Sequence, residues 1–117
     1  MAKVYLRVTY SVAVQNVPGF DRALLDEVLP LARKLGIRVE GIWKTTVGKV
    51  GEYLELWIFD SMDEFDRKWS ALMNHPQLQE TFRVTGPMVH DERFALLRSL
   101  FEGPNDHSDI SGTMSLQ

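Results

Sequence analysis

The seven residues 53–59, YLELWIF, limit the possible folds more than any other part of the 117-residue chain. Their β-branched and aromatic composition predicts a β-strand, along which side chains alternate between the two faces of a sheet. One face would carry Leu54, Leu56 and Ile58, and the other Tyr53, Glu55, Trp57 and Phe59. Both faces are apolar except for Glu55, whereas a sheet with one solvated face alternates apolar and polar residues. The strand therefore predicts a sheet that is covered on both sides.

Four strands and three helical segments are expected along the chain, and the second and third strands are expected to form a hairpin. The strands are predicted at residues 3–14, 37–46, 53–59 and 89–100. A first amphipathic helix is expected from Phe20 to Gly36, with a kink or split at Pro30. A second helix begins after Ser61, which forms a capping box with Glu64, and a short third helix begins at Pro76.

This order of elements predicts an α+β, ferredoxin-like βαββαβ domain that spans residues 1–101. Its four-stranded antiparallel sheet is expected to have the strand order 4-1-3-2, with the helices on one face. One layer of helices covers only one face of a sheet, so a second copy of the chain is expected to cover the other. The sequence therefore predicts a homodimer that forms a dimeric α/β barrel.

The polar segment 102–117 is the alternative cover for the second face. Its small, polar residues cannot bury much apolar area, so a flexible tail or an arm that orders against a partner is expected instead.

The charge and composition exclude several classes of partner and chemistry. A net charge of −3 argues against nucleic acid, since phosphate binding requires a basic surface. The absence of cysteine excludes disulfides and thiolate chemistry. No apolar run approaches the roughly 18 residues of a membrane span, and the N-terminus lacks a signal-peptide core. We therefore expect a cytoplasmic protein that binds neither membranes nor nucleic acid.

Glu55 and Arg7 are the candidate catalytic residues. If the first and third strands are antiparallel neighbours, the two side chains can form a cross-strand pair on one face of the sheet. The pair is then either a structural ion pair or part of a site in which Glu55 transfers protons. Burial among aromatic residues would raise the pKa of Glu55, which suits proton transfer near neutral pH.

Aromatic and histidine side chains supply the candidate substrate-binding residues. These are Tyr5, Trp43, Tyr53, Trp57, Trp69, His75 and His90. The alternative is that the tryptophans fill the core and that His75 caps a helix. The histidine spacing matches no common metal motif, and no glycine-rich loop opens a helix. We therefore expect neither a metal nor a cofactor.

Four segments of the sequence resemble the NIPSNAP family over roughly residues 3–100. The segments are LPLARKLG at 29–36, IWKTTVG at 42–48, LELWIFDSMDEFDRKWSAL at 54–72 and RFALLRSL at 93–100. The resemblance implies membership of the dimeric α/β-barrel superfamily. That superfamily includes cofactor-independent monooxygenases of antibiotic biosynthesis, muconolactone isomerases, polyketide cyclases and haem-binding relatives. The family often carries a histidine where this chain has Glu55, so a histidine-dependent role would not carry over.

Together these features predict a small homodimeric enzyme that acts on a small apolar or aromatic metabolite. Glu55, with Arg7, Tyr5 and Tyr53, would support isomerisation, cyclisation or cofactor-independent oxygenation in a pocket between sheet and helices. The alternative is a non-catalytic module that binds a ligand or another protein.

Overall fold

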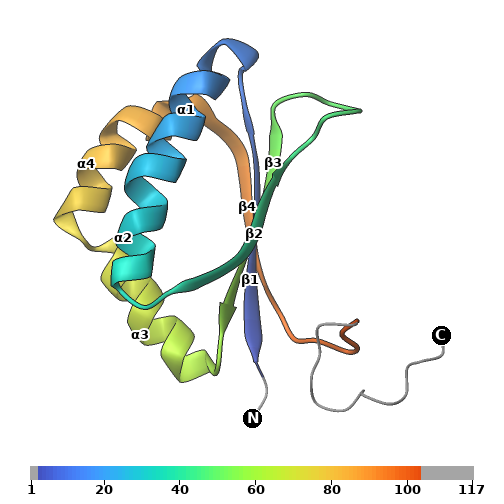
Figure 1. Cartoon of the computed structure of the whole chain (residues 1–117), viewed down its shortest axis with the longest axis vertical. Helices are drawn as coiled ribbons and strands as arrows, with labels where there is room; N and C mark the ends of the chain where they lie inside the picture. The colour runs from blue at the N-terminus through green and yellow to red at the C-terminus, as the bar shows by residue number, and fades with distance from the viewer. Residues whose placement is uncertain (1–2, 104–117) are drawn as a thin grey trace.

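A computed structural model describes residues 3–103 and places four strands in one antiparallel sheet (Figure 1). The strands are β1 (Val4–Val12), β2 (Arg38–Lys44), β3 (Glu52–Phe59) and β4 (Val89–Leu97). The observed strand order is β2-β3-β1-β4. This confirms the predicted ferredoxin-like fold with its order 4-1-3-2, in which β3 and β1 are the central strands.

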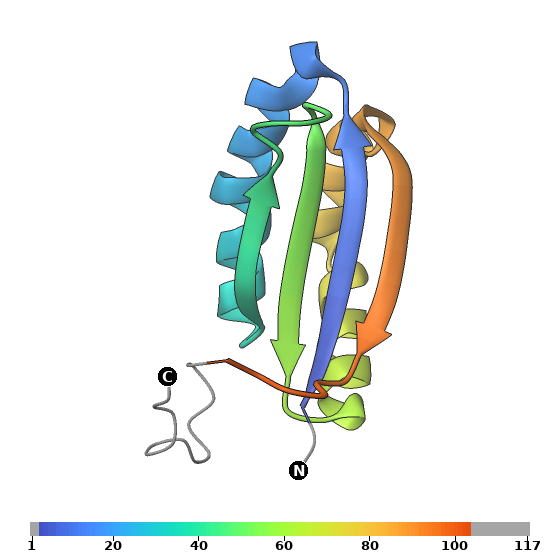
Figure 2. The same cartoon turned by 90° about the vertical axis from the view of Figure 1, so that its right-hand side faces the viewer.

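The helices form a single layer on one face of the sheet, and Figure 2 views the molecule from the opposite, open face. The segments are η1 (Val14–Asn16), α1 (Val17–Ala23), η2 (Leu24–Val28), α2 (Leu29–Lys34), α3 (Met62–Met73), α4 (Pro76–Thr85) and η3 (Gly86–Met88). Among residues 3–103, no helix is long and apolar enough to span a membrane.

A π-helical turn accommodates Pro30 inside the first helical region. The segment η2 is π-helical, and the Leu29 N–H donates to the carbonyl of Leu24. Proline lacks a backbone N–H, and its ring clashes with the carbonyl four residues earlier in a regular helix. The wider π turn relieves this conflict. The kink or split that was expected at Pro30 is thus present as the π-helical segment η2 between α1 and α2.

The predicted caps of α3 and α4 are present. At the start of α3, the Glu64 N–H donates to Ser61 Oγ at 3.0 Å, and the Asp60 N–H donates to Glu64 Oε1 at 2.5 Å. In a standard capping box the Glu64 side chain would accept a hydrogen bond from the Ser61 N–H. Here it accepts one from the N–H of the preceding residue, Asp60. At the start of α4, His75 Nδ1 accepts a hydrogen bond from the Gln77 N–H at 3.1 Å. His75 therefore acts as a helix cap in this structure.

The two faces of the sheet differ in how they are covered. The buried face carries Val4, Leu6, Val8, Tyr10 and Val12 from β1, and Tyr53, Glu55, Trp57 and Phe59 from β3. On the open face, Leu54 and Leu56 are half-buried and Ile58 is 8% exposed. The described helices thus leave an apolar patch of β3 without a covering layer of helices, in which Leu54 and Leu56 are partly exposed and Ile58 is already buried within the protomer.

The chain after β4 runs back across the lower end of the sheet (Figure 2). Within this segment, the carboxylate of Glu102 accepts a hydrogen bond from the Tyr5 hydroxyl. Residues 104–117 lie outside the described part of the chain, so the flexible tail or arm stays a prediction.

Gly51 provides a direct test of the turn that leads into β3. Its φ is +97°, and a Cβ at this position would lie 2.4 Å from the carbonyl oxygen of Val12. We expect Gly51→Ala to lower the free energy of unfolding by about 2 kcal/mol, because both the backbone conformation and the contact become strained. The matched control is Gly19→Ala in α1, where a Cβ meets no atom within 4 Å. That change should raise stability by about 0.5 kcal/mol. Denaturant unfolding measures both, and equal effects would contradict the role of Gly51.

Candidate functional site

Glu55 lies in the middle of β3, on the face that packs against the helices. Its backbone is paired with Val8 of β1 and Ile42 of β2, so it occupies the centre of the sheet. The residue is 8% exposed. A carboxylate at such a position requires polar partners, because an unpaired buried charge is strongly destabilising.

Two side chains supply those partners. The Tyr10 hydroxyl donates to Glu55 Oε2 at 2.5 Å, and Trp57 Nε1 donates to Glu55 Oε1 at 2.9 Å. Both carboxylate oxygens therefore accept a hydrogen bond from within the protein. Among residues 3–103, no lysine, arginine or histidine forms an ion pair with Glu55.

This environment raises the pKa of Glu55 above its ordinary value. Burial is the largest cause, since it penalises the ionised carboxylate. The hydrogen bonds from Tyr10 and Trp57 oppose burial by stabilising the ionised form, and the charge of Glu92 raises the pKa further. The pKa of Tyr10 is also raised, by burial first and then by Glu55. Tyr10 is thus a neutral hydrogen-bond donor at physiological pH, and Glu55 retains a proton at higher pH than an exposed glutamate.

An aromatic cluster surrounds this pair. The ring of Tyr53 stacks on Tyr10 with centroids 5.1 Å apart, and Phe20 of α1 contacts both rings edge-on. On the other side, Trp57 packs against the edge of Trp69 at 5.5 Å. These contacts fix the orientation of both hydrogen-bond donors to Glu55.

A second polar cluster adjoins the first through Tyr53. Its hydroxyl donates to Asp21 Oδ1 at 2.5 Å, and Lys44 Nζ lies 2.6 Å from Asp21 Oδ2. Burial and the bond to Asp21 raise the pKa of Tyr53 above its usual range. The polar groups of β1, β2, β3 and α1 are therefore connected through two stacked tyrosines.

The predicted pair of Arg7 and Glu55 is wrong. Arg7 is paired with Leu56 and its side chain is exposed, whereas Glu55 is paired with Val8. Paired residues in a sheet share a face and successive residues alternate, so Arg7 and Glu55 lie on opposite faces. Both roles proposed for the pair, as an ion pair and as a joint site, are excluded in this protomer.

The other candidate residues divide between the two faces. Tyr53, Trp57 and Trp69 lie on the helix side and belong to the cluster around Glu55. Tyr5 lies on the open face with Arg7, and Trp43 lines a cavity there. His90 is exposed and is paired with Ser11, and His75 caps α4. The structure therefore gathers only three of the seven predicted substrate-binding residues around Glu55.

The sequence reasoning missed Tyr10, Asp21 and Glu92. Tyr10 could have been found by the alternation of β1, because it shares a face with Val4, Leu6, Val8 and Val12. Its hydroxyl is the only polar side-chain group on that buried face of β1. Asp21 and Glu92 carry no comparable signal, since charged residues of a helix face and an edge strand are usually solvated.

Two surface features border the region between sheet and helices. On β4, Phe94 is 53% and Leu96 44% exposed, although their partners Val8 and Leu6 on β1 are buried. The helices therefore leave an apolar strip of β4 uncovered. At the opposite edge, a crevice of about 220 Å³ between α2 and β2 reaches Trp57.

Metal ligands are not grouped in the described part of the chain. No set of three or more histidine, aspartate or glutamate residues is positioned to hold a metal ion among residues 3–103.

Comparisons with known proteins agree with this architecture. The NIPSNAP family model matches residues 5–100. No match was found among curated proteins. A NIPSNAP family protein of unknown function from Agrobacterium tumefaciens (Atu4242) superimposes with a TM-score of 0.77 at 18% identity, over 87% of this chain and 92% of that chain.

Two further solved structures show the same fold. An uncharacterised NIPSNAP domain protein from Burkholderia xenovorans has a TM-score of 0.70 at 23% identity, over 81% of this chain and 91% of that chain. SnoaB, a cofactor-independent oxygenase from Streptomyces nogalater, has a TM-score of 0.67 at 14% identity, over 87% of this chain and 97% of that chain.

Proposed function

The chain belongs to the NIPSNAP family, and we propose that it is a small homodimeric enzyme that acts on a small apolar or aromatic molecule by acid–base chemistry. The observation that carries the proposal is the buried Glu55, whose carboxylate is held by Tyr10 and Trp57 and whose pKa is raised. A carboxylate with a raised pKa is a stronger base, and general bases work best when their pKa lies near the operating pH.

In this proposal Glu55 removes a proton from an acidic C–H or O–H group of the bound molecule. Tyr10 acts as a positioning residue, because its hydroxyl fixes one carboxylate oxygen. The uncovered strip of Phe94 and Leu96, which β1 separates from Glu55, would supply part of the apolar surface for the bound molecule. Isomerisation, cyclisation and cofactor-independent oxygenation can all begin with such a proton transfer. The similarity of fold to SnoaB is consistent with the last of these.

The homodimer follows from the open face of the sheet. Leu54, Leu56 and Ile58 form an apolar patch there that the described helices do not cover. A second copy related by two-fold symmetry would bury this patch against its equivalent. The fold is consistent with this arrangement, since proteins of this fold family typically form dimers.

A non-catalytic ligand-binding or interaction module is the second candidate. One observation favours it: both oxygens of Glu55 already accept internal hydrogen bonds, as in a structural polar network.

Solvent deuterium exchange distinguishes the two candidates without knowledge of the natural substrate. We expect the protein to accelerate exchange at the acidic C–H positions of small aromatic ketones such as indanone and tetralone, measured by NMR. Glu55→Gln should lower this rate by at least about a hundredfold, since general bases typically contribute that much. Circular dichroism should show an intact fold. Glu40→Gln, at an exposed position of β2, is the control and should retain the rate. Equal rates in both variants would exclude Glu55 as the base.

A further inference from the structure

Two apolar side chains just after β4 are turned away from the protomer. Leu100 is fully exposed and Phe101 is 86% exposed, so the described part of the chain buries neither of them. The next residue, Glu102, is half-buried, and its carboxylate accepts a hydrogen bond from the Tyr5 hydroxyl. A segment that faces water normally shows the opposite pattern, with the charge outside and the apolar residues inside. This reversal indicates that the outer side of the segment faces another apolar surface.

Residues 98–102, RSLFE, form an exit segment that lies on the open side of the sheet. Figure 1 shows the chain leaving β4 on the side opposite the helices, and Figure 2 shows it crossing the lower end of the sheet. Its contact residue Tyr5 is paired with Ile58 and belongs to the open face. Leu100 and Phe101 therefore project on the side where the proposed homodimer places the second copy.

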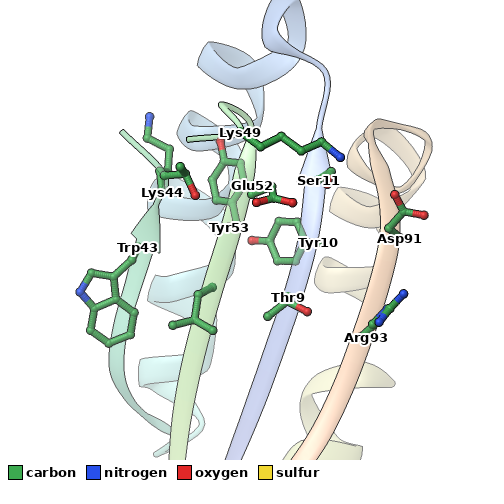
Figure 3. A pocket seen from close by; sticks show the side chains of 12 residues that line it. Thr9, Tyr10, Ser11, Trp43, Lys44, Lys49, Glu52, Tyr53, Asp91 and Arg93 are labelled. Carbon is green, nitrogen blue, oxygen red and sulfur yellow. The ribbon is translucent and has the colours of Figure 1, made fainter. Parts of the chain in front are cut away.

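The other end of the open face is recessed. A cavity of about 600 Å³ lies there beside the β2–β3 hairpin, and all four strands contribute residues to it (Figure 3). Trp43, which is 49% exposed, and the half-buried Leu54 supply apolar area to its wall. The indole lies against the β2 backbone at Gly41, where a Cβ would lie 2.5 Å from the ring. Charged residues of both signs complete the lining: Lys44, Lys49, Glu52, Asp91 and Arg93.

Two-fold symmetry relates these two ends of the open face. In a two-fold interface both copies use the same surface, so a projection on one copy must fit a recess on the same surface of the other. Here the exit segment projects at one end of the face and the cavity is recessed at the other. If the symmetry axis runs across the strands, each exit segment lies over the cavity of the other copy. The same contact then forms twice in each dimer.

We propose that Leu100 and Phe101 of each copy insert into the cavity of the other copy, where Trp43 and Leu54 supply the apolar contact. Aromatic side chains seated in recesses are frequent anchors of protein–protein interfaces. The charged lining residues would surround this contact as a polar rim. The inference rests on the homodimer proposed above and extends it, because it makes the cavity a recess for the second copy and names the residues that fill it.

Cross-linking tests the contact directly, because the chain has no native cysteine. The double variant Phe101→Cys with Ser11→Cys, a cavity residue, is treated with a short bismaleimide and run on a denaturing gel. We expect a covalent dimer, since the two cysteines approach each other only between copies. A contact within one chain would instead leave a monomer on the gel. The control pairs Ser11→Cys with Leu25→Cys, at an exposed position of η2 in the helix layer, and should give no covalent dimer.

The dissociation constant of the dimer provides the second test. Phe101→Glu should raise it at least about a hundredfold, because a charge replaces an apolar anchor in both copies. Leu25→Glu, at an exposed apolar position in the helix layer, should leave it unchanged. Sedimentation velocity measures all three proteins, with circular dichroism as the check on folding.

The outcomes separate this contact from the homodimer itself. A native dimer with an unchanged dissociation constant in Phe101→Glu would overturn the contact and leave the homodimer standing. A double variant that forms no covalent dimer, although sedimentation shows it to be dimeric, would do the same. A native protein that is monomeric at micromolar concentration would overturn both. None of these results depends on whether Glu55 is a catalytic base.

Discussion

Tyr10→Phe is expected to lower the free energy of unfolding by about 3 kcal/mol at neutral pH and by only about 1 kcal/mol near pH 4. The substitution removes the hydroxyl that donates to Glu55 Oε2 at 2.5 Å and leaves the ring in place. The stacked Tyr53 and the edge contact of Phe20 are therefore retained. What changes is the hydrogen bonding of one buried carboxylate oxygen, which loses its only partner among residues 3–103.

The dependence on pH follows from the direction of the Glu55 pKa shift. The folded protein holds this proton more tightly than the unfolded chain, where the pKa is about 4.5. Stability from this group is therefore complete at pH values below 4.5 and is lost as pH rises through the folded pKa. The Tyr10 bond lowers the folded pKa, so its removal raises that pKa further. The variant consequently loses additional stability as pH rises above the folded pKa of the native Glu55.

Tyr53→Phe is the matched control for this measurement. It also removes one tyrosine hydroxyl from the aromatic cluster, but Asp21 keeps its contact with Lys44. A loss of about 1 kcal/mol is expected. Chemical denaturation between pH 4 and pH 8 provides the comparison. A loss for Tyr10→Phe that is the same at both ends of this range would show that Glu55 does not depend on Tyr10.

The composition of the strands and the order of the elements along the chain were sufficient to predict the sheet and its strand order. The first strand roughly alternates, the third is recognisable by its aromatic and apolar composition, and the hairpin between residues 37–46 and 53–59 leaves few possible topologies. The capping residues Ser61 and His75 were also identifiable, because their roles depend on neighbours within four residues. Local signals thus determined the elements and their ends to within a few residues.

The candidate site was less predictable because it depends on register. Moving a strand by one residue exchanges all its side chains between the two faces. Arg7 and Tyr10 are both polar residues of β1, and only the pairing of Val8 with Glu55 shows which of them shares a face with the glutamate. Glu55 shares its face of β3 with Tyr53, Trp57 and Phe59, so this face is buried. A hydrogen-bond partner from β1 must therefore lie on the apolar face of β1, which carries Tyr10 but not Arg7.

Leu56→Glu is expected to convert the proposed homodimer into a folded monomer. Leu56 lies on the open face of β3 and is only half-buried within the protomer, so the fold should tolerate a charge there. In a two-fold interface the substitution would introduce two unpaired buried carboxylates, one from each copy. We therefore expect the dissociation constant of the dimer to rise by about a thousandfold, equivalent to about 4 kcal/mol.

Sedimentation velocity at micromolar concentration measures this change, with circular dichroism as the check on folding. Val47→Glu is the control, because Val47 is an exposed apolar residue of the β2–β3 hairpin, outside the two strands and the open-face patch. It should remain dimeric, since adding the same charge there buries nothing. A native protein that is monomeric at this concentration would exclude the barrel. A dimeric Leu56→Glu variant would instead place the interface elsewhere.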